Sequence, residues 1–190
     1  MVFGAGDGTS PDRIKLIREK MTIRQEKPED IDEIHALNEL AFGQPLEADI
    51  IDTIRNNCEE ILSLIAIEGG KIAGHILFSP AVIKGPDGES RGMGLAPMVV
   101  SPERQRKGIG TLLVRTGIER LKKAQCPFII VLGHPEYYPR FGFERASLYG
   151  VTCQWEGIPD EAFMILWLDR SKAAAVSSRA TYRDEFKATM

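Results

Sequence analysis

The stretch Leu95–Gly110, LAPMVVSPERQRKGIG, decides how this chain is expected to fold. An apolar run ends at a Ser-Pro pair, a basic loop follows, and two glycines then open an amphipathic segment. This order predicts a strand, a loop and the start of a helix, whose first N–H groups have no partner inside the helix. Because the helix dipole is positive at that end, the segment predicts a site for a phosphate-bearing ligand.

The residues of this loop favour a phosphate-binding site. Gly108 and Gly110 let the backbone approach a pyrophosphate closely, and the basic residues from Arg104 to Lys107 can supply counter-charge. A Walker loop is excluded, because no glycine-rich stretch ends in Gly-Lys-Ser or Gly-Lys-Thr. The dinucleotide-binding fingerprint also fails, since Leu113 stands where its third glycine belongs. A glycine-rich helix start beside a solvated basic loop is the alternative that these residues leave open.

Hydrophobic periodicity and turn residues predict an alternation of strands and helices in the rest of the chain. The expected strands are Thr22–Gln25, Ile61–Glu68, Lys71–Val82, Arg91–Val100, Phe128–Leu132, one beginning at Phe143, and a final one at Ala162–Leu168. The expected helices begin at Pro28 and extend over Glu47–Asn57 and Ile109–Ala124. The strand Arg91–Val100 contains two glycines and a proline, which mark a bulge or a close approach of backbone.

Composition narrows the classes of protein. A chain of 190 residues with 43% hydrophobic residues favours one domain with a sizeable core. The net charge of -3 argues against a nucleic-acid-binding protein. No apolar run reaches the roughly 20 residues that span a membrane. The three cysteines, Cys58, Cys126 and Cys153, form no metal-ligand pattern and no disulfide framework, so we expect a cytoplasmic protein without a metal.

The two ends of the chain differ from its middle. Residues 1–20 are expected to be an N-terminal extension, with a short charged helix at Asp12–Lys20. Residues 21–168 are the expected folded domain. Residues 169–190 are expected to be a C-terminal tail that docks on the domain or is disordered, with Tyr182 and Phe186 as its aromatic residues.

Two motifs carry a resemblance to a known family. The stretch Gln105–Gly110, QRKGIG, matches the Q/R-x-x-G-x-G/A motif of the GCN5-related N-acetyltransferases, or GNAT family. The stretch Tyr138–Phe143, YPRFGF, resembles that family's Y-x-x-x-G-F. The resemblance spans about Met21–Leu168, and it is strongest to a poorly characterised branch of acetyltransferases. It implies an α/β fold with a mixed, mostly antiparallel twisted sheet, helices on both faces and a splayed central pair of parallel strands.

The resemblance implies N-acetyltransfer from acetyl-CoA to a primary amine, by direct attack in a ternary complex. Tyr138 is the implied proton donor to the leaving thiolate, although Pro139 disfavours helical geometry there and Tyr137 is its neighbour. His134, at the end of a predicted strand, is a candidate general base, against a simple turn histidine. The expected cofactor-binding residues are Met98, Val99, Val100, Gln105, Arg106, Lys107, Gly108, Ile109, Gly110 and Thr111.

Other interpretations stay open. One alternative is an acyl-CoA sensor, which keeps the cofactor site but has lost catalytic turnover. Another is a partner-binding domain, in which the motifs have no function. The residues do not identify the acceptor amine or the acyl chain. No membrane or nucleic-acid partner is expected, and a homodimer is an assembly that similar proteins adopt.

Overall fold

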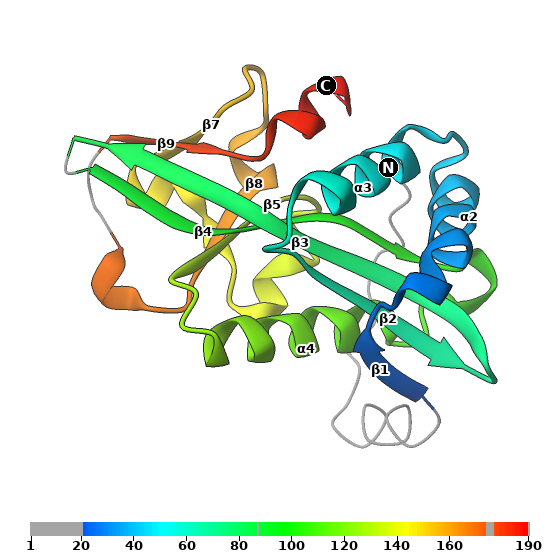
Figure 1. Ribbon diagram of the computed structural model, residues 1–190. Coiled ribbons are helices and arrows are strands. Elements are labelled where there is room, and N and C mark those ends of the chain that lie inside the picture. The colour runs from blue at the N-terminus through cyan, green and yellow to red at the C-terminus, as the bar shows by residue number, and fades with distance from the viewer. Residues whose placement is uncertain (1–20, 87, 174–176, 190) are drawn as a thin grey trace. The chain divides into compact units, whose positions relative to one another are not determined.

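The computed structural model describes residues 21–86, 88–173 and 177–189 (Figure 1). The expected N-terminal extension and its helix at Asp12–Lys20 lie outside the described residues. The strands are β1 Met21–Gln25, β2 Leu62–Glu68, β3 Lys71–Gly85, β4 Gly88–Val100, β5 Phe128–Leu132, β6 Glu144–Arg145, β7 Val151–Cys153, β8 Phe163–Trp167 and β9 Ser178–Thr181. The α-helices are α2 Ile31–Phe42, α3 Leu46–Asn57 and α4 Ile109–Lys123.

Short 3-10 turns connect these elements. They are η1 Pro28–Asp30, η2 Pro102–Arg104, η3 Tyr138–Phe141, η4 Ala146–Tyr149, η5 Asp160–Ala162, η6 Arg170–Lys172 and η7 Asp184–Thr189. The described residues divide into two compact units. The first unit comprises 21–77, 97–118 and Thr189, and the second comprises 78–86, 88–96, 119–173 and 177–188. Strands β3 and β4 each contribute residues to both units.

In the first unit, β1 pairs antiparallel with β2, from Met21 opposite Glu68 to Gln25 opposite Leu64. β2 and β3 are neighbours in the sheet, joined through Gly69-Gly70. Both glycines have positive φ, +60° and +78°, which is the backbone that a tight two-residue hairpin requires. The hairpin turn expected at these glycines is therefore confirmed.

The two faces of β3 in the first unit are covered by different helices. Successive side chains of a strand point to opposite faces. His75 lies beside Asn38 of α2, with a ring nitrogen 3.3 Å from the amide nitrogen. At Gly74, by contrast, an added Cβ would lie 3.1 Å from side-chain atoms of Ile109 and Leu113 on α4. The expectation of helices on both faces is confirmed.

The first unit's apolar core lies where α2 packs on the strands. Its buried cluster is Ile34, Leu37, Ala41, Ile65, Ile72 and Val99. The helical members recur at i, i+3 and i+7, which places them on one face of α2. Burying such a face stabilises a helix more than its intrinsic propensity does.

The second unit contains the parallel pair. β4 pairs parallel with β5 from Met93–Ile129 to Leu95–Val131. The pairing then ends, although β4 continues to Val100. β5 pairs antiparallel with β8, and β8 pairs antiparallel with β6. The expected mixed, mostly antiparallel arrangement with a parallel β4–β5 pair is therefore confirmed.

The C-terminal segment departs from expectation. The strand at Ala162–Leu168 is not the last one, because β9 pairs antiparallel with β3 and parallel with β7. Ala180 is fully buried, and Tyr182 and Phe186 are each only 6% exposed. The sequence of β9, SRAT, alternates between buried and more exposed positions, but its buried residues, Ser178 and Ala180, are small and only the alanine is apolar. Its periodicity was therefore too weak to predict a strand.

Candidate active site

The loop between β4 and α4 belongs to the first unit and has an unusual backbone. Arg106 has φ +61° and Gly108 has φ +83°, both in the left-handed region. A non-glycine residue rarely adopts this conformation, and such residues concentrate at functional sites. α4 then begins at Ile109, as expected, and the N–H of Leu112 donates to the Gly108 carbonyl. The preceding N–H groups of the first turn have no acceptor inside the helix.

Two side chains of the loop fasten it to neighbouring strands. Arg104 donates to the backbone carbonyl of Glu68 at 3.1 Å and pairs with the Glu68 carboxylate at 3.2 Å. Gln105 donates to the carbonyl of Val100 at 3.3 Å. The Arg104 guanidinium is therefore paired with Glu68, whereas the side chains of Arg106 and Lys107 are exposed.

The end of β4 is held against β3. The N–H of Ser101 donates to the carbonyl of Ala73 at 2.9 Å, and the carbonyl of Val99 would lie 3.1 Å from a Cβ at Gly74. Val99 is buried, while Met98 and Val100 are half-buried. Gly74 thus lets the end of β4 and the start of α4 approach one strand closely, which fixes the loop between them.

Tyr138 belongs to the second unit, where it opens the turn η3. Its ring is 3% exposed and packs edge-on against Tyr137 and Phe143, with centroids 5.1 and 5.6 Å away. A Cβ at Gly133 would overlap the Tyr138 ring, so glycine is required there. Burial, with a smaller contribution from Tyr137, raises the pKa of Tyr138 well above its ordinary value. The hydroxyl is therefore protonated at neutral pH.

Neighbouring residues of η3 have different surroundings. Tyr137 is half-buried, and the Arg140 guanidinium lies 4.7 Å from its ring centroid. His134 is half-buried, and its backbone carbonyl accepts hydrogen bonds from the N–H groups of Tyr137 and Tyr138, at 3.1 and 3.4 Å. Pro139 is accommodated because η3 is a 3-10 turn. The ten expected cofactor-binding residues lie in the first unit, and Tyr138 and His134 lie in the second.

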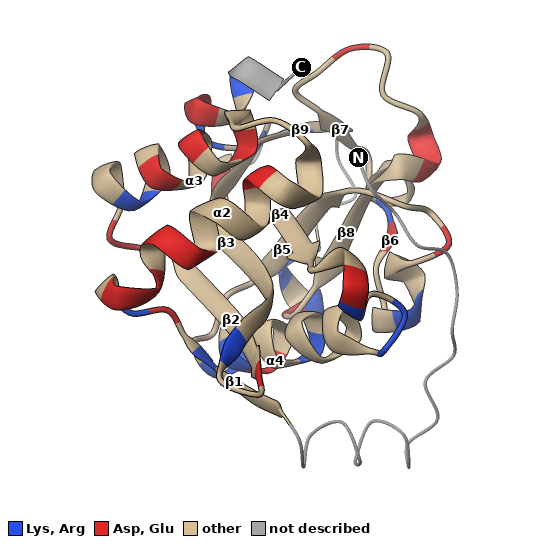
Figure 2. Ribbon diagram, turned by 90° about the vertical axis from the view of Figure 1, so that its right-hand side faces the viewer, with Lys and Arg blue, Asp and Glu red and all other residues tan. Residues whose placement is uncertain are grey.

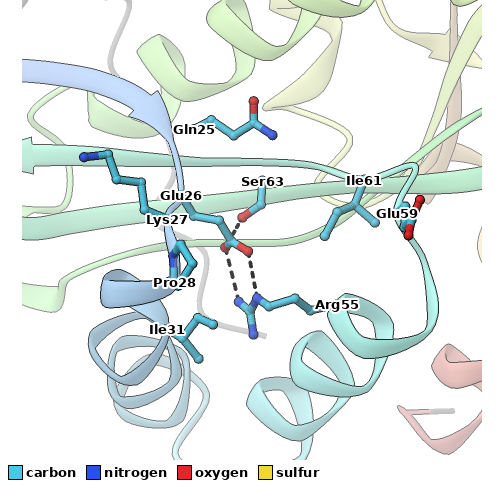
Figure 3. A pocket seen from close by; sticks show the side chains of 9 residues that line it. All are labelled: Gln25, Glu26, Lys27, Pro28, Ile31, Arg55, Glu59, Ile61 and Ser63. Carbon is cyan, nitrogen blue, oxygen red and sulfur yellow. Dashed lines mark hydrogen bonds and ion pairs between the residues drawn. The ribbon is translucent and has the colours of Figure 1, made fainter.

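A buried polar cluster in the first unit was not predicted from the sequence. The Glu26 carboxylate accepts hydrogen bonds from Ser63 Oγ and from Arg55, whose Nε lies 2.7 Å away (Figure 3). Ser63 Oγ is also 2.9 Å from Nε2 of His75. The cluster joins α3, β2, β3 and the residue directly after β1, and residues so distant along the chain carry no common sequence signal.

The side chains of this cluster differ in charge. His75 is fully buried, and burial lowers its pKa to about 4, so its ring is neutral at physiological pH. Desolvation raises the pKa of the Glu26 carboxyl, but hydrogen bonds from Arg55 and Ser63 together with nearby positive charge lower it by more, so the net shift is downward. The shallow hollow beside Glu26 has a volume of about 210 Å³ and its nine lining side chains are labelled in Figure 3. Because the carboxylate is already paired, we interpret the cluster as structural.

Two further observations concern the described part of the chain. No group of three or more His, Cys, Asp or Glu side chains there is arranged to hold a metal ion. None of its helices is both long and apolar enough to cross a membrane.

The fold is a mixed α/β arrangement with a parallel β4–β5 pair, and comparison with known proteins identifies the family. Residues 22–146 match the model of the acetyltransferase (GNAT) domain. The uncharacterized N-acetyltransferase YhbS of Escherichia coli K12 is 30% identical over 167 residues, 87% of this chain and 98% of that protein. The chain therefore belongs to the GNAT family of acetyltransferases.

Other similar proteins are also acetyltransferases. The uncharacterized N-acetyltransferase YjhQ of E. coli K12 is 43% identical over 120 residues, which are 62% of this chain and 66% of YjhQ. The crystal structure of E. coli YhbS in complex with CoA has a TM-score of 0.80, with 28% identity, and the match covers 88% of this chain and 92% of that one. A GNAT acetyltransferase from Brucella melitensis in complex with acetyl-CoA has a TM-score of 0.71 and 33% identity, covering 87% and 97%.

Proposed function

We propose that this protein transfers an acetyl group from acetyl-CoA to a primary amine, by direct attack in a ternary complex. The observation that carries the proposal is the loop before α4, where left-handed Arg106 and Gly108 precede a helix start. This backbone suits a pyrophosphate, because N–H groups and the helix dipole converge on an anion there. The complexes of the similar YhbS and B. melitensis proteins with CoA and acetyl-CoA support it.

The residues present fit this ligand. The N–H groups from Gly108 to Thr111 would hold the phosphates, and the exposed Arg106 and Lys107 would add positive charge. The backbone of Met98–Val100 would supply N–H donors to the oxygen that becomes negative as the amine attacks. Arg104 and Gln105 would contribute indirectly, since they hold the loop in place.

Proton transfers accompany the reaction. Bound acetyl-CoA would supply the acetyl group as a thioester. A C–N bond forms, the C–S bond breaks, the sulfur gains one proton and the nitrogen loses one. Tyr138, whose hydroxyl stays protonated, would donate to the departing sulfur. His134 is the candidate group that takes the proton from the amine.

The first unit favours a cationic acceptor. Acidic residues gather along α2 and α3, as Figure 2 shows. They are Asp32, Glu33, Glu39, Glu47, Asp49 and Asp52, against one basic residue, Arg55. A local negative potential raises the concentration of amines that carry positive charge. We therefore propose small polyamines or lysine-like amines as the first acceptors to test.

The testing experiment is calorimetric titration of the purified protein with acetyl-CoA and with acetyl-pantetheine, which lacks the pyrophosphate. We expect micromolar or tighter binding of acetyl-CoA, and at least tenfold weaker binding of acetyl-pantetheine. A free-thiol assay with candidate amines then measures turnover. Binding without turnover on any amine would favour an acyl-CoA sensor, and no binding by folded protein would favour a partner-binding domain.

A further inference from the structure

The hairpin of β2 and β3 supports the loop before α4 in the first unit. The N–H of Ser101, where the loop begins, donates to the Ala73 carbonyl of β3 at 2.9 Å. Further along the loop, Nη1 of Arg104 lies 3.1 Å from the backbone carbonyl of Glu68 on β2 and 3.2 Å from the Glu68 carboxylate. The first part of the loop is therefore fixed to both strands of one hairpin.

The end of this hairpin is itself held from two sides. Glu68 is the last residue of β2, and it pairs with Met21 of β1 in the sheet. Across the turn, the N–H of Ile72 on β3 donates to the Glu33 carboxylate of α2 at 2.8 Å. Strand pairing and the contact with α2 restrict the motion of Glu68, so the loop rests on a firm support.

The Glu68 carboxylate is an unfavourable charge for the ligand that the loop is proposed to bind. The pyrophosphate of acetyl-CoA is negatively charged, so a nearby carboxylate repels it, whereas Arg104 without Glu68 would attract it. The side chains of Arg104 and Glu68 are 24% and 37% exposed, and an ion pair with that exposure contributes little to stability. We therefore expect its main effect in the position of the loop.

We propose that Glu68 is a positioning residue for the loop: by holding Arg104, it keeps the N–H groups at the start of α4 aligned for the pyrophosphate of acetyl-CoA. This inference rests on the proposed function. A loop that is held in one conformation before the ligand arrives loses less conformational entropy on binding. Arg104 then acts through the fold, and the exposed Arg106 and Lys107 supply the positive charge beside the phosphates.

The test is Glu68→Ala in the full chain, measured by calorimetry. Charge alone predicts tighter binding of acetyl-CoA, because a negative charge is lost and Arg104 is released. Positioning predicts the opposite, a Kd about three- to tenfold higher. The Kd for acetyl-pantetheine, which lacks the pyrophosphate, and the melting temperature stay unchanged. Glu103→Ala is the matched control: it removes an exposed carboxylate from the turn η2 of the same loop, and its Kd for acetyl-CoA is equal or lower.

A double-mutant cycle shows whether Glu68 acts through Arg104. Arg104→Ala should raise the Kd for acetyl-CoA, and combining it with Glu68→Ala should raise the Kd no further, because both changes remove one contact. Effects that multiply in the double variant would overturn the proposed role. If Glu68→Ala does not fold, Glu68→Gln replaces it. Its Kd should also rise, because a neutral acceptor bonds the Arg104 guanidinium more weakly than a carboxylate does.

The outcomes separate the positioning role from the proposed function. If the unsubstituted protein binds acetyl-CoA and Glu68→Ala binds it equally or more tightly, the role of Glu68 is overturned and the proposed function stands. Equal weakening of acetyl-CoA and acetyl-pantetheine would overturn that role too, because it would indicate a general distortion. If the folded, unsubstituted protein does not bind acetyl-CoA, both proposals are overturned.

Discussion

At the scale of single residues, the adjacent tyrosines of η3 illustrate how burial separates two candidates of the same type. Tyr138 is enclosed by aromatic rings and by Gly133, whereas Tyr137 is half-buried beneath Arg140. Burial raises the pKa of Tyr138, so its hydroxyl stays protonated and is a weaker acid than an ordinary tyrosine. Tyr138 remains the proposed proton donor because it, and not Tyr137, occupies the tyrosine position of the motif YPRFGF.

Tyr138→Phe should lower kcat by about 100-fold, the contribution typical of a positioned general acid. The Kd for acetyl-CoA should change less than about twofold, because the proposed phosphate contacts remain. Steady-state kinetics in the free-thiol assay, with calorimetry for affinity, measure both. Tyr137→Phe is the control and should retain full activity. Normal turnover of Tyr138→Phe would remove Tyr138 from the mechanism.

The burial of His75 leads to a prediction of how the free energy of unfolding depends on pH. Its pKa is about 4 in the folded protein, against an ordinary value of 6.5, and burial is the main cause. Between these values the unfolded chain binds a proton that the folded chain does not, so stability falls as pH falls. The free energy of unfolding should drop by about 2 kcal/mol between pH 7.5 and 5 from this residue. Urea unfolding at a series of pH values measures the slope.

Two variants test whether His75 causes this pH dependence: His75→Gln removes the buried ring, and His35→Gln is the control. His75→Gln should lose most of this slope, while His35→Gln should keep it, because His35 is partly exposed and pairs with Asp52. Glu26 has a lowered pKa and adds to acid destabilisation only below its ordinary value of 4.5. An unchanged slope in His75→Gln would contradict a neutral, buried His75.

At the scale of elements, the loop before α4 combines a strained backbone with firm anchoring. Arg106 and Gly108 adopt left-handed conformations. Arg104 ties the same loop to Glu68 of β2, and the N–H of Ser101 ties it to β3. A loop that is held on both sides can present its N–H groups before any ligand arrives, which lowers the entropic cost of binding.

Gly108→Glu should raise the Kd for acetyl-CoA by about 100-fold or more, because it adds a side chain and a negative charge where phosphate would bind. The left-handed backbone makes the substitution cost about 1–2 kcal/mol, so the protein should remain folded. Calorimetry and thermal melting measure the two effects. Gly43→Glu is a matched control in the same unit, since Gly43 has φ +73° and open space around its Cβ position. Equal affinities of the two variants would refute the phosphate assignment.

At the scale of the whole molecule, the C-terminal segment belongs to the fold rather than following it. β9 pairs with two strands, and Ala180, Tyr182 and Phe186 are buried. Deleting residues 177–190 should lower the melting temperature by about 10 °C or more, because several buried side chains and two strand pairings are lost. Lys187→Ala is the control, since its ion pair with Asp184 is exposed, and it should melt normally. Normal melting of the truncated chain would contradict the pairing of β9.

Much of the architecture was predictable from local patterns. The strands at Phe128–Leu132 and Lys71–Gly85 and the helix at Ile109–Lys123 have strong apolar periodicity, and their expected bounds agree closely with the structure. The strand expected from Phe143 is present as the two-residue strand β6, Glu144–Arg145. The short strands β7 and β9 were not expected, since three or four residues are too few to show a period. Their existence depends on neighbours that are distant in the chain, and such pairings leave no local pattern.

The amino-acid sequence alone determined the family and predicted the loop that leads into α4, because both depend on residues within a few positions of one another. Only the tertiary structure decided that Arg104 anchors the loop, that Glu26, Ser63 and His75 form one cluster, and that the Tyr182 hydroxyl is buried without a partner. The physical reason is that burial and hydrogen-bond partners depend on which elements pack together. That packing is set by the apolar faces of the whole chain rather than by any short segment.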